Sequence, residues 1–270
     1  MAQVNRTSNN TGGETIPILM YHQVSPHVFP TFRKYTVTPS SFARQMGWLA
    51  SAGYMAISLD MLFDARAGQT TLPAKPVIIT FDDGFQGCVD YAIPILLQHH
   101  FTAIFYLVAG LMGKPSVWLE AERGITMPLM DLPTAREIAN QGFVCGAHTM
   151  THPRLAQLDA DVCQNELHES RQYLQDELGQ PVKHLAYPFG SFNASVRACA
   201  AELGYRSACS TMIGRSPCND DPFALHRVPV CGQDTLLDFI CRLRTARTVR
   251  EFTRDGVLQL QQQLWSRSNR

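Results

Sequence analysis

The chain has 270 residues, of which 45% are hydrophobic and 17% charged, so it is long enough to bury one sizeable core. Its formal net charge is +0 and its lysines and arginines form no long block, which excludes the electrostatic footprint of a protein that binds nucleic acid or an anionic membrane. No apolar run reaches the length of a membrane span, and residues 1–15 lack the basic start and apolar centre of a secretory signal.

Eight cysteines are scattered without close pairs, mostly within apolar strand or helix patterns. They are Cys88, Cys145, Cys163, Cys199, Cys209, Cys218, Cys231 and Cys241. This pattern indicates buried free thiols rather than a disulfide framework. Because no signal peptide is visible, we predict a reducing compartment and therefore a cytoplasmic location.

Strand and helix patterns alternate along the chain after a polar segment, residues 1–15, that we expect to be disordered. The predicted strands are residues 16–22, 54–58, 77–81, 101–108, 143–145, 184–187, 205–209 and 225–230. The predicted helices are residues 38–53, 91–99, 134–141, 161–178, 195–203 and 235–245. Residues 109–131 contain many breakers and are expected to form a loop over the mouth of the fold.

Seven or eight strands that alternate with helices predict an α/β fold, a parallel (β/α) barrel rather than an open sheet. No repeat, low-complexity block or linker divides the chain. We therefore predict a single domain over residues 16–246, with a disordered tail at 1–15 and a polar extension at 247–270.

The predicted strand 77–81 ends in two adjacent carboxylates, Asp82 and Asp83. Two charges at the tip of a buried strand cost desolvation free energy unless a cation, hydrogen bonds or water compensate them. Adjacent strand residues point to opposite sides, so one carboxylate can hold a metal while the other acts as a base. The sequence does not decide which residue takes which role.

Two imidazoles, His148 and His152, follow the predicted strand 143–145. Their four-residue spacing lets both rings converge on one ion, either on a helical turn or in a tight loop. One carboxylate and two imidazoles, with water in the open position, are ligands expected of catalytic zinc or a similar divalent ion.

These motifs occur in a characteristic order: TFDDG at residues 80–84, HTMTHP at 148–153 and AYPFG at 186–190. Together they resemble the polysaccharide deacetylase family, the NodB-homology domain of carbohydrate esterase family 4, over roughly residues 16–230. The first strand, ending in Tyr21 and His22, is similar to the exopolysaccharide-deacetylase subgroup. The resemblance implies a distorted barrel and a metal-dependent hydrolase, and many of its members act outside the cell.

The resemblance also implies roles for single residues. Asp83, His148 and His152 would bind one divalent ion, with zinc expected ahead of cobalt, nickel or manganese. Asp82 would be the general base, and the Phe189 amide would stabilise the oxyanion. The residues expected to contact substrate are Tyr187, Pro188 and Trp118, although Trp118 could equally be a core residue.

Two departures from the family pattern leave roles open. Ala186 stands where relatives have an arginine that contacts the base, and we name Arg227 as the candidate to replace it. The family's acid lies in a Leu-x-His motif, whereas His226 directly follows Leu225. We favour His226 as the acid, but a shift of one residue turns a strand side chain to the other face, so His22 competes.

The leading hypothesis is removal of an N-acetyl or similar small acyl group from an amino sugar of a glycan or glycan precursor. A second enzyme hypothesis is a deformylase or a hydrolase of small cyclic amides. A non-catalytic carbohydrate-binding barrel is a third, which the complete set of Asp82, Asp83, His148 and His152 disfavours. The expected partner is a carbohydrate, without nucleic acid or a membrane span.

Overall fold

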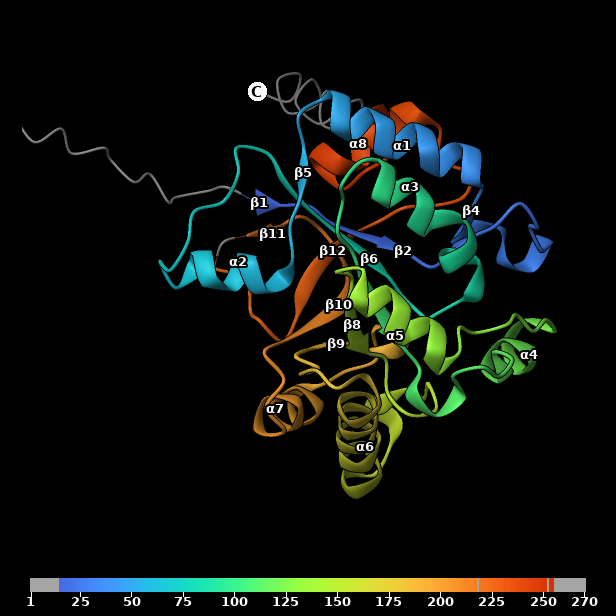
Figure 1. The fold of residues 1–270 in the computed structure, drawn as a ribbon, viewed down its shortest axis with the longest axis vertical. Helices are drawn as coiled ribbons and strands as arrows, with labels where there is room; N and C mark the ends of the chain where they lie inside the picture. The colour runs from blue at the N-terminus through green and yellow to red at the C-terminus, as the bar shows by residue number, and fades with distance from the viewer. Residues whose placement is uncertain (1–14, 218, 252, 255–270) are drawn as a thin grey trace, which may run out of the picture.

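The computed structural model describes residues 15–217, 219–251 and 253–254, and a barrel of seven parallel strands lies at its centre (Figure 1). In spatial order the strands are β2 (Ile18–Tyr21), β12 (Leu225–Pro229), β10 (Ser207–Ile213), β9 (His184–Ala186), β8 (Val144–Ala147), β7 (Ile104–Leu107) and β6 (Pro76–Phe81). Pairing of β2 with β6 closes the barrel, and β5 (Met55–Ala56) pairs with the first residues of β6. The predicted α/β barrel is therefore confirmed.

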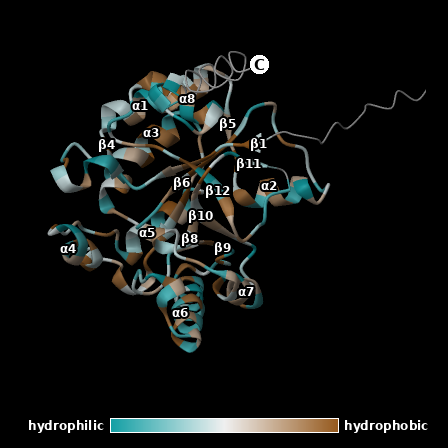
Figure 2. Ribbon diagram, turned by 180° about the vertical axis from the view of Figure 1, so that it is seen from behind, coloured by the Kyte–Doolittle hydropathy of each residue, from teal (hydrophilic) through white to brown (hydrophobic). Residues whose placement is uncertain are grey.

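Side chains on the two faces of the strands belong to two different clusters of buried hydrophobic residues. On β6, Ile78 belongs to a cluster that extends to α2 (Leu59–Arg66), whereas Ile79 belongs to the larger cluster. Successive strand residues point to opposite faces, which is why β6 is apolar apart from Thr80 and buried on both sides. The hydrophobic colouring in Figure 2 is accordingly strongest on the central strands, while the surrounding helices carry hydrophilic faces.

In the described part of the chain, eight named α-helices surround the barrel, and residues 249–251 and 253–254 are helical as well. They are α1 (Pro39–Ser51), α2 (Leu59–Arg66), α3 (Ile93–Gln98), α4 (Val117–Arg123), α5 (Leu132–Asn140), α6 (Ala160–Leu178), α7 (Ala194–Glu202) and α8 (Leu236–Thr245). Short helical turns are η1 (Pro30–Tyr35), η2 (Cys88–Ala92), η3 (Ala109–Leu111), η4 (Leu155–Gln157) and η5 (Pro188–Gly190). Two small ladders pair β1 (Thr15–Ile16) with β11 (Ser216–Pro217), and β3 (Gln23–Val24) with β4 (Thr36–Val37).

Local sequence signals placed the longer helices correctly. The Thr38 hydroxyl caps α1, and Gly179 ends α6 in the left-handed conformation. Helix α2 was missed because it is short and follows a two-residue strand. Residues 109–131 are not a plain loop, since they contain η3 and α4. Helix α4 has seven residues, too few to show an apolar period among the breakers around it.

Parts of the predicted organisation lie outside the described residues, namely residues 1–14 of the tail and residues 255–270 of the extension. The domain boundaries remain a prediction. The seven described cysteines are free thiols, of which Cys199, Cys231 and Cys241 are only partly buried. Among the described helices, none is both long and apolar enough to cross a membrane.

Candidate active site

Asp82 and Asp83 follow β6 at the carboxyl end of the barrel and diverge there. The Asp82 amide donates to the Tyr21 carbonyl at 3.0 Å, so Asp82 still continues the strand. Asp83 instead has a φ of 75°, a left-handed conformation that costs free energy for a residue with a Cβ. This turn separates the two carboxylates, which contact different partners.

The Asp83 carboxylate meets both histidines. Its Oδ1 lies 3.3 Å from His148 Nε2 and 3.2 Å from His152 Nε2, and all three side chains are buried. Burial raises the pKa of Asp83, but the contacts with His148 and His152 outweigh it and hold the pKa far below its usual range. In the described part of the chain, these three residues form a cluster that could hold a metal ion.

The donor set fits a divalent ion. His148 Nδ1 donates to the Ala186 carbonyl at 2.7 Å, so Nε2 is the nitrogen that faces the Asp83 oxygen. Burial lowers the pKa of His152, which favours its neutral ring. One carboxylate with two imidazoles suits zinc.

A third carboxylate, that of Glu166, was not identified from the sequence and holds the loop between the two histidines. Glu166 on α6 accepts hydrogen bonds from the amides of Met150 at 2.8 Å and Thr151 at 3.0 Å, and from the Thr151 hydroxyl at 2.6 Å. Within the loop, the His152 amide donates to the Thr149 hydroxyl at 3.0 Å. The only sequence signal is an acidic residue on the helix that follows the loop.

Asp82 forms a buried ion pair with Arg227 from β12. Nη1 and Nη2 of Arg227 lie 2.6 and 2.7 Å from the two carboxylate oxygens, and Nε donates to the Ser210 carbonyl at 2.8 Å. Arg227 is fully buried. Burial raises the pKa of Asp82. The charge and hydrogen bonds of Arg227 lower this pKa by more than burial raises it, so the pKa lies below the usual value. Asp82 is therefore ionised.

Both carboxylates and both histidines line one cavity of about 440 Å³. Trp118 from α4 lines it too, with its ring stacked on His152 at a centroid distance of 4.2 Å. His22, directly after β2, also faces the cavity and packs on Tyr35. The cavity thus brings together the candidate metal ligands, the Asp82 carboxylate, the His22 imidazole and an aromatic wall. It lies at the carboxyl ends of the strands, the usual position of a barrel active site.

Residues 69–208 match the family model for polysaccharide deacetylases. The chain belongs to the polysaccharide deacetylase family. Streptococcus pyogenes deacetylase PplD, solved in complex with acetate, is 26% identical with a TM-score of 0.74, over 87% of this chain and 99% of that one. YxkH of Bacillus subtilis (strain 168), whose name places it among polysaccharide deacetylases, is 26% identical over 80% of this chain and 71% of its own length.

A shorter match links this family member to the poly-beta-1,6-N-acetyl-D-glucosamine N-deacetylase of Escherichia coli (strain K12). The two are 32% identical over 84 residues, which are 31% of this chain and 12% of the Escherichia coli protein. The chitooligosaccharide deacetylase of Rhizobium leguminosarum bv. trifolii is 25% identical over 134 residues, 49% of this chain and 54% of that protein.

The structure does not bring His226 to the active site of this family member. Its Nδ1 lies 3.1 Å from Asp220, and it does not line the cavity. The neighbouring side chain, Arg227, points inward instead, as alternation along β12 requires. The only register shift with β10 lies between Cys209 and Ile213 of β10, so no bulge in β12 returns His226 to the inner face. Of the two candidate acids, His22 lines the cavity and His226 does not, so the position of the side chains favours His22, and the role of either histidine stays a prediction.

In the third family motif only Phe189 reaches the cavity. It has a φ of 57°, and its ring lies 4.6 Å from that of His152. Tyr187 and Pro188 were expected to contact substrate, but both are buried away from the cavity. The Tyr187 hydroxyl donates to the Phe223 carbonyl at 3.0 Å, and its ring stacks on Phe192. These two residues form the support of the Phe189 turn.

Four of the six described non-glycine residues with positive φ lie at this site: Asp83, Thr149, His152 and Phe189. Such conformations cost free energy and persist where the surrounding contacts impose them. Their concentration around one cavity indicates that the local backbone is shaped to orient these side chains.

Proposed function

We propose that the protein is a metal-dependent deacetylase that removes the N-acetyl or a similar small acyl group from an amino sugar of a glycan or glycan precursor. The observation that carries the proposal is the separation of two carboxylates at one strand end: Asp83 faces two histidines, while Asp82 is held ionised by Arg227. The Escherichia coli and Rhizobium relatives, named for N-acetylglucosamine and chitooligosaccharide substrates, support an amino sugar.

Asp83, His148 and His152 are the proposed ligands, and one carboxylate with two imidazoles is typical of catalytic zinc, with cobalt, nickel or manganese as the alternatives. When bound, such an ion supplies a Lewis acid that polarises the acyl oxygen and makes water more acidic. The ordered His148 tautomer and the Glu166 contacts hold the ligand side chains in position before binding.

Asp82 is the proposed general base. Because Arg227 keeps its pKa low, Asp82 is unprotonated at neutral pH and accepts the proton of the attacking water. Arg227 is a positioning residue that fixes both carboxylate oxygens. The proposed role of Phe189 is donation from its backbone amide to the oxygen on which negative charge develops.

His22 is the proposed proton donor to the leaving amine. Burial is the main cause that lowers its pKa, so its protonated ring is a stronger acid than an ordinary histidine. Trp118 is proposed to contact the sugar. Its stacking on His152 gives the cavity a flat aromatic wall next to the metal ligands.

The test is release of acetate and of formate from a panel of N-acylated amino sugars and small cyclic amides, with and without chelator. Chelator-sensitive acetate release from the amino sugars is expected. Formate release alone, or hydrolysis of the cyclic amides alone, would replace this proposal by the second enzyme hypothesis. Sugar binding without hydrolysis in metal-loaded protein would instead indicate a binding barrel. The cytoplasmic location predicted from the sequence stays a prediction.

A further inference from the structure

Four charged side chains line the cavity besides the two aspartates: Lys34 from η1, Glu122 and Arg123 from α4, and Arg154 from the loop after β8. Arg154 pairs with Glu122 at 2.9 Å, and its guanidinium lies 3.8 Å from the centre of the Phe189 ring. The ion pair with Arg154 neutralises Glu122, so the two remaining charged side chains of this group are Lys34 and Arg123.

The cationic groups of Lys34 and Arg123 both lie close to the ring of Tyr35. The Lys34 ammonium lies 5.4 Å and the Arg123 guanidinium 5.1 Å from the ring centre. Arg123 also donates to the Thr31 carbonyl at 2.9 Å, a contact that joins α4 to η1. Among the residues that the structure describes, no acidic side chain is within ion-pair distance of either cation.

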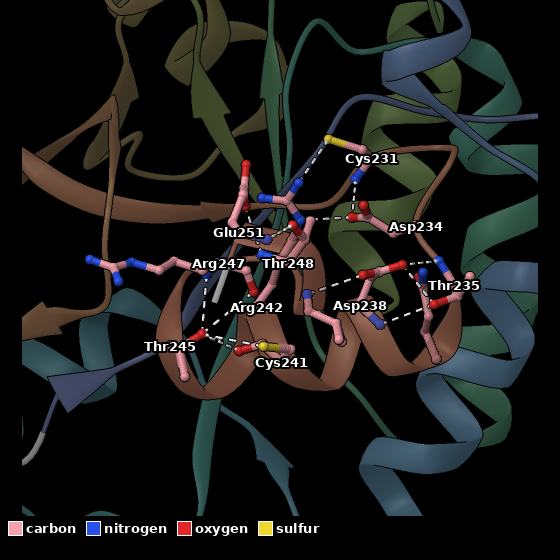
Figure 3. Close-up of polar contacts among 12 residues, drawn as sticks. Cys231, Asp234, Thr235, Asp238, Cys241, Arg242, Thr245, Arg247, Thr248 and Glu251 are labelled. Atoms are coloured by element: carbon pink, nitrogen blue, oxygen red, sulfur yellow. Dashed lines mark hydrogen bonds and ion pairs between the residues drawn. The ribbon is translucent and has the colours of Figure 1, made fainter. Parts of the chain in front are cut away.

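The backbone around Lys34 is held by the loop between β12 and α8. The Gly232 amide donates to the Lys34 carbonyl at 3.0 Å, and a Cβ at Gly232 would collide with the Thr36 carbonyl, so the two segments need this glycine. The acid of that loop, Asp234, is engaged elsewhere, since it accepts from the Cys231 amide at 2.9 Å and pairs with Arg242 at 3.0 Å (Figure 3). Asp234 therefore does not neutralise Lys34.

The cavity consequently has a surplus of positive charge on one wall. Asp82 is neutralised by Arg227 and Glu122 by Arg154, and Asp83 faces the proposed metal position. A concave site with charge of one sign concentrates ligands of the opposite sign. The Tyr35 ring contacts both cations and also His22, whose ring lies 4.9 Å from that of Tyr35. A group held by the cations would thus lie one aromatic ring away from the proposed proton donor.

We propose that Lys34 and Arg123 bind an anionic group, a carboxylate or a phosphate, on the same or the adjacent sugar as the acyl group that is removed. The inference rests on the proposed deacetylase function and deepens it by naming the substrate class, an anionic N-acylated glycan. The planar guanidinium matches two oxygens of a carboxylate or phosphate, the ammonium adds a point charge, and the face of Tyr35 suits a sugar ring.

The experiment measures acetate release at low and high salt from three matched oligosaccharides. One is a neutral N-acetylglucosamine oligomer, the second carries a 6-phosphate, and the third alternates with N-acetylmuramic acid, which has a carboxylate. We expect kcat/KM for at least one anionic substrate to exceed the neutral value by about tenfold at low salt, mainly through KM, and the advantage to shrink as salt rises. The two anionic substrates distinguish phosphate from carboxylate recognition.

Lys34→Ala and Arg123→Gln should each remove most of this preference. Arg33→Ala is the matched control, because Arg33 precedes Lys34 on η1 but faces a different groove. A wild-type enzyme without preference, or an equal loss in Arg33→Ala, overturns the inference while acetate release still supports the proposed function. If no substrate is hydrolysed, the proposed function fails, and calorimetric binding of the same oligosaccharides to the variants then decides the inference alone.

Discussion

Arg227 on β12 donates to both carboxylate oxygens of Asp82 at the end of β6, across 145 positions of sequence. Both side chains are buried, so each charge depends on the other for compensation. The pair explains how a carboxylate can stay ionised inside the barrel although Ala186 occupies the position where the family pattern has an arginine.

Replacing Arg227 should move the acidic limb of the pH profile. Without the guanidinium, Asp82 loses the largest influence that lowers its pKa against burial, so the pKa rises and turnover that needs ionised Asp82 is lost at a higher pH as the solution is acidified. Arg227→Met should also lower the free energy of unfolding by about 3–5 kcal/mol. Arg227→Lys keeps a charge without the paired geometry and should give a smaller shift. The kcat/KM profiles of the two variants test this, and unchanged acidic limbs would show that Asp82 is not the base.

The two adjacent aspartates should respond differently to the same substitution. Asp83→Asn removes a proposed ligand and should lose metal and turnover, whereas Asp82→Asn should retain metal and lose nearly all turnover. Elemental analysis with single-turnover assays separates these outcomes. His148→Ala and His152→Ala should lose metal as well. Equal metal loss in both aspartate variants would make Asp82 a ligand rather than a base.

Glu166→Gln should weaken metal binding without touching a ligand. The amide side chain loses the charge that accepts from the Met150 and Thr151 amides, so the loop between the histidines is held less firmly. We expect metal affinity to fall by about 10-fold, within the range for groups that orient ligands. Chelator competition measures it. Glu169→Gln, on the exposed face of the same helix, is the control and should retain normal affinity.

His22→Ala should lower turnover by roughly 10²-fold with metal retained, because it removes the proposed proton donor. It should also flatten the alkaline limb of the pH profile. His226→Ala is the matched control, since His226 faces Asp220 outside the cavity and should leave turnover near normal. If the His22 variant keeps both its rate and its alkaline limb, the leaving amine receives its proton from another group.

Asp60 offers a stability test at the opposite end of the barrel. It contacts His184, Lys183 and Arg206, and these hydrogen bonds, that of His184 first, lower its pKa. A lowered pKa gives stability that is present above about pH 4, the unfolded value, and is lost as pH falls toward the folded pKa. Asp60→Asn should lower Tm by about 2–4 °C at pH 7. The difference should shrink on acidification, while the exposed control Asp176→Asn should show no such pattern.

The sequence by itself predicted the barrel strands and the position of the two aspartates and two histidines at their ends, whereas the choice of Asp83 as the metal ligand came from the family resemblance. A mostly apolar run such as residues 77–81 is stable only when it is buried, so it predicts a central strand. Parallel strands bring their carboxyl ends to one edge, and Asp83, His148 and His152 therefore lie close together. Tertiary structure alone decided that Arg227 faces inward and His226 outward, because a strand side chain's direction depends on register with its neighbours. It also brought Glu166 to the histidine loop, and Lys34 together with Arg123, through contacts between segments that no local pattern links.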